Sequence, residues 1–395
     1  MRILSLDAGS SSLKFALYTD ETHELQRIAS GTCTASGGSL TIMDSATGAT
    51  QAMVVRLSSA PSTPSAWSII SCVEWLFAAF DRHRIGLPTA VGHRLVFGGP
   101  ERTQPTRATP EVLADLERFV PLYPLHLRSE LDLVRSVQAH QGDIPQVLCF
   151  DTAFHQAMPE IAKRYPLPSS LDPIVRRYGY HGLSYEYILS LVQAGEAAHL
   201  IIAHLGNGAS LAAVRDGRPV DTTMGFSTLG GLMMGTRPGD LDPGVLLHLL
   251  NVEGRSAQQL TTLVNEQCGL LGVSGTSSDM QTLLEDRRTG VAAAAFAVDL
   301  FAYQARKHIG ALVAVLGGFD TLIFTGGIGE HASPVRQLIC DGLQHLGIVL
   351  DAARNAANAG IISKDDSTVS VRVIPTDESL MVARHTRRLL AAGAG

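Results

Sequence analysis

Hydrophobic residues along the chain form short apolar runs that alternate with longer segments of helical periodicity. Residues 3–17 and 200–214 each have the pattern of a strand, a turn of small residues and a second strand. Further strands are predicted at 90–96, 146–150, 321–325 and 369–374. Amphipathic helices are predicted at 110–120, 127–139, 185–194, 242–250, 291–316, 334–346 and 378–391. Because strands alternate with helices over most of the length, the pattern predicts an α/β fold.

The two strand–turn–strand segments resemble each other, and one lies near the start of the chain while the other lies near its middle. A duplicated domain plan explains the likeness, although two hairpins that are alike by chance would give the same pattern. The length of 395 residues fits two or three domains of about 150 residues each. Since the second hairpin should open the sheet of a second domain, we expect a boundary near residue 150.

Composition excludes several classes of protein. Charged residues make up 17% of the chain against about 25% in an average protein, which argues against disorder and against a coiled coil. The net charge of −6 gives no general attraction for nucleic acid. The most apolar segment, 291–298, ends at Asp299 and is too short to span a membrane, and no signal peptide is recognisable. The five cysteines form no C-x-x-C pair, so we expect buried free thiols in a soluble, cytoplasmic protein.

Three glycine-rich turns follow apolar strands. They are residues 9–12, with Lys14 close behind, residues 206–208 and residues 326–330. Small side chains let backbone N–H groups approach an oxyanion, and hydroxyl groups add further donors. The Walker A pattern is absent, and each turn alone also fits an ordinary polar hairpin. The three together favour a nucleoside triphosphate as ligand.

Charged and polar residues beside these turns suggest what else is bound. Arg94 in Gly-His-Arg and Arg237 in Gly-Thr-Arg-Pro-Gly-Asp have glycine on both sides, which is typical of a crowded backbone near a ligand. A guanidinium group matches carboxylate and phosphate oxygens with two parallel hydrogen bonds, although a surface salt bridge is the more common use of arginine. His181 and Asp151 lie beside apolar strands, where a single histidine or aspartate is more often structural.

Nine segments together resemble one family, the acetate kinases of the acetokinase branch in the sugar kinase, heat-shock protein and actin superfamily. The likeness covers nearly the whole chain, in order. The segments are LDAGSSSLKFAL, VGHRLVFGG, FDTAFHQAMP, RRYGYHGLSYEY, HLGNGASLAAV, MGTRPGDLDPG, GVSGTSSDM, FTGGIGEHASPVR and IPTDESLMVAR. The resemblance implies two actin-like (ribonuclease H-like) domains, each with a mixed five-stranded sheet, and an interdomain cleft.

The resemblance also implies domain limits and an activity. Residues 1–150 with about 379–395 would form the N-terminal domain, and residues 151–378 would form a C-terminal domain with the nucleotide site and the interface of a homodimer. The activity is the reversible transfer of the γ-phosphoryl group of ATP to acetate or propionate. Its products are ADP and an acyl phosphate such as acetyl phosphate, formed by direct in-line attack with Mg²⁺ or Mn²⁺. No nucleic acid or membrane is expected as a partner.

The family's site residues carry over position by position. By likeness, Arg94 and Arg237 would hold the carboxylate and the transferred phosphoryl group, His181 would stabilise that group, and Asp151 would orient an arginine or a metal-bound water. Metal ligands would be Asp7 and Glu378. Residues around the acyl group would be Arg94, Val96, Leu125, Tyr180 and Thr228. Nucleotide-binding residues would be Ser10, Ser12, Lys14, His204, Gly206, Asn207, Gly208, Asp279, Met280, Gln281, Gly326, Gly327, Ile328, Gly329 and His331.

Some positions depart from the family pattern, so the substrates stay open. Asp7 stands where acetate kinases usually have asparagine, and we expect it to face Mg²⁺ or its waters. Thr228 replaces a proline of the acyl pocket, and Met280-Gln281 replaces Phe-Arg on the adenine side. The alternatives are another short-chain acid, a donor such as pyrophosphate, or a nucleotide-binding regulator that has lost catalysis. The joint presence of the arginines, His181 and the acidic residues argues against the regulator.

Overall fold

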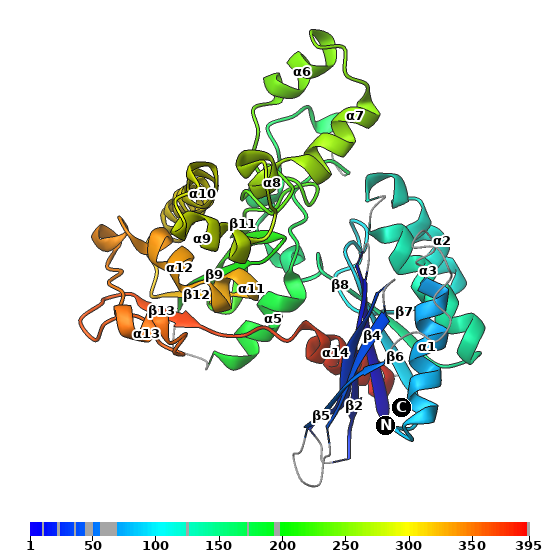
Figure 1. Cartoon of the computed structure of the whole chain (residues 1–395). Helices are drawn as coiled ribbons and strands as arrows, with labels where there is room; N and C mark the ends of the chain where they lie inside the picture. Colours follow the sequence, from blue (N-terminus) through cyan, green and yellow to red (C-terminus); the bar gives the residue numbers. More distant parts are fainter. Residues whose placement is uncertain are drawn as a thin grey trace. The chain divides into compact units, whose positions relative to one another are not determined.

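The computed structural model divides the chain into two compact units. The first unit is Met1–Ala153 with Asp377–Gly395, and the second is Phe154–Thr376. The model describes residues 1–9, 12–21, 24–34, 37–43, 50–55, 69–123, 126–171, 174–192 and 198–392. Each unit combines helices with one mixed sheet, so the predicted α/β class is confirmed (Figure 1).

The first unit contains one sheet together with helices from both ends of the described chain. Its strands are β1 (Arg2–Ala8), β2 (Ser12–Thr19), β3 (Gln26–Thr34), β4 (Gly37–Met43), β5 (Thr50–Val55), β6 (Ala90–Leu95), β7 (Thr106–Arg107) and β8 (Gln146–Phe150). Its helices are α1 (Ile69–Arg82), α2 (Pro110–Glu117), the short 3₁₀ turn η1 (Val120–Leu122), α3 (Leu127–Gln141) and α14 (Glu378–Ala392). The final helix α14 therefore belongs to the N-terminal unit.

The expectation of five strands in the first sheet is wrong. Within the described residues this sheet has eight strands in the order β5-β4-β3-β2-β1-β6-β8-β7. The extra strands are mainly β3, β4 and β5, which extend the sheet as an antiparallel ribbon beyond β2. The segment that forms them is rich in Gly, Ser and Thr, and its alternation of apolar and polar residues is weak. Pairing with a preformed neighbour, rather than a strong local pattern, makes these residues into strands.

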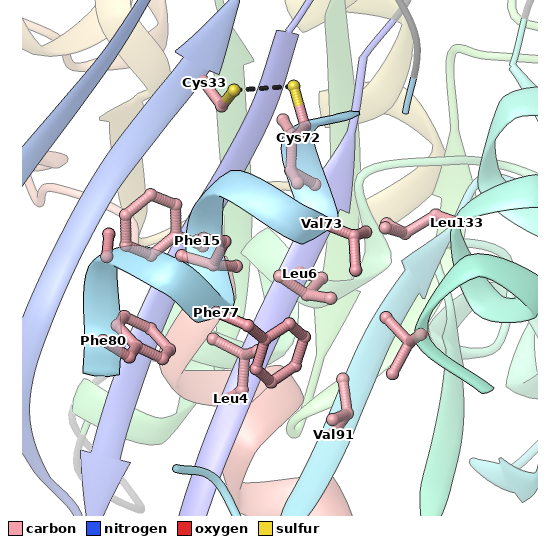
Figure 2. Packing of buried hydrophobic residues seen from close by; sticks show 14 of the residues in the cluster. Leu4, Leu6, Phe15, Cys33, Cys72, Val73, Phe77, Phe80, Val91 and Leu133 are labelled. Carbon is pink, nitrogen blue, oxygen red and sulfur yellow. Dashed lines mark hydrogen bonds between the residues drawn. The ribbon is translucent and has the colours of Figure 1, made fainter. Parts of the chain in front are cut away.

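Side chains along β1 point alternately to the two faces of the first sheet. Leu4 and Leu6 point into one core with Val73 of α1 and Leu133 of α3, as Figure 2 shows. Ile3 points to the opposite face, where it packs with Ala383 of α14. Helices α1 and α3 thus cover one face and α14 covers the other (Figure 1).

The cysteines agree with the expectation of free thiols. Cys33, Cys72, Cys149 and Cys340 are buried, whereas Cys268 is only partly buried. The sulfurs of Cys33 on β3 and Cys72 on α1 lie 2.6 Å apart at one end of the core in Figure 2. Burial raises the pKa of the Cys340 thiol, which keeps it in its unreactive protonated form.

The second unit repeats the plan with a smaller sheet. The sheet order within the described residues is β11-β10-β9-β12-β13, so five strands are confirmed here. Its strands are β9 (His199–Leu205), β10 (Ala209–Arg215), β11 (Arg218–Thr222), β12 (Thr321–Thr325) and β13 (Ser370–Val373). Its helices are α4 (Glu160–Lys163), α5 (Gly182–Leu191), α6 (Pro243–Asn251), α7 (Ala257–Thr262), α8 (Gly269–Ser274), α9 (Met280–Arg288), α10 (Ala292–Leu316), α11 (Gly326–His331), α12 (Ser333–Cys340) and α13 (Ala352–Ala356). Short turns complete it at η2 (Phe154–Ala157), η3 (Ser169–Leu171), the π-turn η4 (Leu263–Gln267) and η5 (Gln344–Leu346).

Helices pack on the second sheet as they do on the first. Tyr185 and Ile188 of α5 lie in one core with Ile202 of β9 and Ile323 of β12. The long helix α10 packs against β9, β10 and β11. The glycine-rich residues after β12 are the first turn of helix α11 rather than a hairpin turn. No helix among the described residues is long and apolar enough to cross a membrane.

Candidate active site

Strand register brings three charged residues of the first unit side by side. Asp7 on β1 is paired with Lys14 on the antiparallel strand β2 and with Arg94 on the parallel strand β6. Paired residues on neighbouring strands point to the same face of a sheet. The two arms of the N-terminal hairpin and the Gly-His-Arg strand therefore share one polar corner.

Carboxyl groups from four elements surround Arg94 in this corner. One terminal nitrogen of the guanidinium lies 3.2 Å from Asp7 Oδ1 and 3.7 Å from Glu130 Oε1, and the other lies 2.5 Å from Asp151 Oδ2. Asp151 follows β8, where its amide donates to the carbonyl of Leu95. Glu378, the first residue of α14, is close enough to interact electrostatically with Arg94. We call Asp7, Arg94, Glu130, Asp151 and Glu378 the acid–arginine cluster.

Negative charge exceeds positive charge in the acid–arginine cluster. Burial raises the pKa of Glu378 to about 8, and repulsion from Asp151 and Asp7 adds to the rise. Burial likewise raises the pKa of Glu130 to about 8, although Arg94 opposes this shift. Burial alone would lower the pKa of Arg94, but the surrounding carboxylates raise it well above its usual value. The guanidinium is thus always charged, while two of its carboxyl neighbours hold a proton near neutral pH.

The donor chemistry of the cluster fits Mg²⁺. Carboxylate oxygens are the hard ligands that Mg²⁺ prefers, and a divalent cation would balance the excess negative charge. In the described part of the chain, no group of three or more His, Cys, Asp or Glu side chains is arranged to hold a metal ion. Mg²⁺ commonly takes only one or two protein carboxylates and completes its shell with water and substrate phosphates. Two carboxylates, such as those of Asp7 and Glu378, would be enough for the protein to hold such an ion.

Glu130 was not predicted from the sequence. It lies on α3, its side chain is fully buried, and its Oε2 accepts a hydrogen bond of 2.9 Å from the amide of Val96. A signal was present, because an acidic residue at position 130 falls on the apolar face that Leu127, Leu131 and Val134 define at helical spacing. A buried carboxyl group on such a face needs a partner, and here the partners are Arg94 and the Val96 amide.

The predicted residues of the second unit gather around His181. His181 has the left-handed backbone conformation, with φ of 58°, immediately before α5. Its Nδ1 lies 2.8 Å from the hydroxyl of Ser210 on β10. Its ring stacks on that of His204, with centroids 4.2 Å apart and planes inclined by 18°. Ser210 and His204 are directly paired across β10 and β9, so the sheet itself holds the ring between them.

Arg237 and His181 both approach the turn at residues 206–208. A β-carbon on Gly208 would lie 2.9 Å from Arg237 Nη2 and 3.2 Å from His181 Nε2. Only a residue without a side chain lets both groups come so close to this turn. The other terminal nitrogen of Arg237 donates to the carbonyl of Thr228 at 2.7 Å, which fixes the guanidinium. Two cationic or hydrogen-donating side chains thus approach one glycine turn, which suits an anion.

The remaining predicted nucleotide residues occupy two helix starts in the second unit. Gly326 has φ of 76° and opens α11 after β12, and Glu330 Oε1 accepts from its amide at 2.9 Å. Asp279 caps α9 by accepting from the amide of Thr282 at 2.8 Å. Three of the predicted nucleotide-binding side chains differ in their exposure to solvent. Gln281 and His331 are exposed, and Met280 is buried.

The residues predicted around the acyl group divide between the two units. Val96 is buried in the first unit. Tyr180 is buried in the second unit, where its hydroxyl donates to the carbonyl of Phe226 at 2.8 Å. Thr228 is half-buried and belongs to the second unit as well. Ser10 and Leu125 lie outside the described residues.

Ser12 and Lys14 both lie on β2, beside the acid–arginine cluster. The carbonyl of Ser12 accepts from the amide of Gly9 at 2.7 Å, which closes the first glycine-rich turn. Ser12 is half-buried and Lys14 is exposed. The Lys14 ammonium group therefore adds positive charge on the solvent side of the same corner.

Comparison with known proteins shows the family of the chain. Residues 2–384 match the model of the acetokinase family. The acetate kinase of Rhodopseudomonas palustris is 44% identical over 405 residues, which covers 99% of both chains. The crystal structure of a Porphyromonas gingivalis acetate kinase has a TM-score of 0.83 and 36% identity, and covers 98% of this chain and 99% of its own. That of a Francisella tularensis propionate kinase has a TM-score of 0.88 and 32% identity, with the same coverage. The chain belongs to the acetokinase family.

Proposed function

We propose that this chain is a kinase of acetate or propionate that uses ATP and forms an acyl phosphate. The family match along nearly the whole chain carries this proposal. The convergence of His181, Arg237 and Gly208 supports it, because such a site neutralises a phosphoryl group. So does the acid–arginine cluster, which offers a guanidinium to a carboxylate and carboxylates to a metal ion. Reversibility follows from the high-energy acyl phosphate product.

The reaction needs little covalent help from the protein. The substrate carboxylate attacks the γ-phosphorus directly. A bond forms between the carboxylate oxygen and the phosphorus while the bond from phosphorus to the bridging oxygen of ADP breaks. Arg94 would hold the carboxylate through its fork of N–H groups, with Asp151 keeping the fork in place. His181 and Arg237 would donate to the equatorial oxygens, where charge spreads in the transition state. Arg94 belongs to the first unit, and His181 and Arg237 belong to the second.

We propose Mg²⁺ as the metal, held by Asp7 and Glu378. Bound there, it would offset charge on the nucleotide phosphates. Protonated Glu378 cannot ligate a metal well, and burial together with neighbouring carboxylates raises its pKa to about 8. Binding of Mg²⁺ should therefore release a proton, which calorimetry in buffers of different ionisation enthalpy would detect.

We also propose a homodimer in the cytoplasm, where ATP is supplied. Helix α6 of the second unit and Val252, the residue that follows it, expose several large apolar side chains, among them Val245 at 44%, Leu247 at 56% and Val252 at 72%. Exposed apolar side chains gathered on one element commonly mark a protein interface. Light scattering should give twice the chain mass, and Leu247→Glu should give the single-chain mass. A wild-type chain that is monomeric at micromolar concentration would contradict the dimer.

A matrix of phosphoryl donors against carboxylic acids tests the activity. The assay traps acyl phosphate as the hydroxamate, with ATP, GTP or pyrophosphate as donor and acetate, propionate or butyrate as acceptor. We expect ATP with acetate or propionate to give the highest kcat/KM. One methylene group alters discrimination by only about 1–3 kcal/mol, so the two acids should differ by no more than about 100-fold. Activity with pyrophosphate alone, or no product with any pair, would refute the proposal.

A further inference from the structure

We propose that Ser210 and Tyr185 are positioning residues that set the tautomer of His181, so that Nε2 carries the hydrogen. This inference rests on the proposed function, in which His181 donates to the transferred phosphoryl group. Phosphoryl oxygens only accept hydrogen bonds, so a neutral histidine helps them only through a protonated nitrogen. Which nitrogen is protonated is decided by the partner of the other one.

A continuous chain of hydrogen bonds ends at His181. The hydroxyl oxygens of Tyr185 and Ser210 lie 2.5 Å apart, and the Ser210 oxygen lies 2.8 Å from His181 Nδ1. Tyr185 and Ser210 are fully buried. They come from different elements, α5 and β10, so the fold rather than the local sequence brings them together.

The relative acidity of the two hydroxyl groups sets the direction of these hydrogen bonds. A phenol is a stronger hydrogen-bond donor than an aliphatic alcohol, so Tyr185 donates to Ser210 and leaves the Ser210 hydrogen for His181 Nδ1. Nδ1 then accepts, and the hydrogen of the neutral ring lies on Nε2. Nε2 is the ring nitrogen nearest to the Gly208 turn, which Arg237 also approaches. The proton is thus placed on the side where the anion is expected.

Packing fixes the plane of the His181 ring but does not choose the tautomer. The ring stacks on His204, whose Nδ1 lies 2.8 Å from the hydroxyl of Ser184. The residue before it, Tyr180, is held through its carbonyl, which lies 2.9 Å from Nε2 of the buried His155. A rigid ring without Ser210 would populate both tautomers, so only part of the molecules would be competent to donate.

The test compares Ser210→Ala with wild type in kinetics and in the ¹⁵N NMR spectrum of the histidine rings. In wild type at a pH where the ring is neutral, we expect His181 Nε2 to have the shift of a protonated nitrogen and Nδ1 that of an acceptor. His181→Gln assigns the signals. Ser210→Ala should move both shifts toward the average of a mixture and lower kcat on the order of 10- to 100-fold, with KM values within about twofold. Tyr185→Phe should give a smaller change of the same sign.

Two further variants separate positioning from folding. Ser210→Thr keeps the hydroxyl and should retain the wild-type tautomer and most of kcat. Ser190→Ala removes a hydroxyl from the exposed side of α5, where it donates to the Tyr187 carbonyl, and should change neither readout. An unchanged tautomer in Ser210→Ala would overturn the inference whatever the rate. Because the spectrum is recorded without turnover, it remains decisive even if the chain proves to make no acyl phosphate.

Discussion

Replacing Glu130 by glutamine should make the first unit more stable than wild type as the pH rises. Glutamine keeps the size of the side chain and an oxygen that can accept from the Val96 amide. It removes only the ionisation of a group that is fully buried. Unfolding exposes Glu130 to water, where it loses its proton easily, whereas the folded protein holds that proton.

The sign and the size follow from the shifted pKa. Burial raises the pKa of Glu130 from 4.5 to about 8, so between these values the folded state binds one more proton than the unfolded state. The free energy of unfolding of wild type therefore falls by about 1.4 kcal/mol for each pH unit in this window, and by about 5 kcal/mol across it. Glu130→Gln has no ionisable group at this position, so its free energy of unfolding should not fall in this way. The difference between variant and wild type should grow with pH up to about 8 and then stay constant.

Urea unfolding followed by tryptophan fluorescence measures this difference. Trp75 lies in α1, so its fluorescence reports the unit that contains Glu130. Measurements at pH 5.5, 6.5, 7.5 and 8.5 should contain EDTA, because a bound cation would alter the charge of the cluster. Glu74→Gln, at an exposed position of α1, serves as the control and should show no comparable trend. Parallel pH profiles for wild type and Glu130→Gln would refute the reasoning.

Three other substitutions test the two halves of the site. Gly179→Ala should destabilise the second unit by about 2 kcal/mol or more, because φ there is 74° and the new β-carbon would lie 2.5 Å from the His155 ring; thermal unfolding by circular dichroism checks this, and an unchanged Tm would contradict it. Arg94→Lys should lower kcat/KM for acetate about 100-fold or more, since lysine cannot hold Asp151 and a carboxylate in one planar fork; a loss below about tenfold would speak against its role. Asp7→Asn should weaken the dependence of the rate on Mg²⁺ concentration, and an unchanged Mg²⁺ titration would exclude Asp7 as a ligand.

Much of the secondary structure could be predicted from the sequence because its signal is local. The strand at 146–150 and the helices at 127–139 and 291–316 agree with β8, α3 and α10 to within a few residues. Helical periodicity depends on residues three and four positions apart, and strand alternation depends on every second residue. Where that local signal was weak, as in β3–β5, the prediction failed, since those strands exist through pairing with β2.

The motif residues were predicted as a set, together with an arginine partner for Asp151, but two of their other partners were not. Resemblance named Arg94, Asp151 and His181, and the structure adds Glu130 and Ser210 as the groups that touch them. Ser210 lies inside the segment HLGNGASLAAV but had no predicted role, and Glu130 lies in none of the nine segments. Glu130 is an acidic residue on a helix, and Ser210 is a serine on an apolar strand.

Local pattern in this chain thus determines where helices and strands form and which segments carry reactive side chains. The fold determines the state of those side chains. A proton resides on Glu130 because burial away from water favours the neutral carboxyl group, even though Arg94 and the Val96 amide favour the charged form. A hydrogen is directed to one nitrogen of His181 because a strand and a helix place hydroxyls beside the other. Desolvation and hydrogen-bond direction depend on neighbours in space, and sequence spacing carries no information about them until the chain is packed.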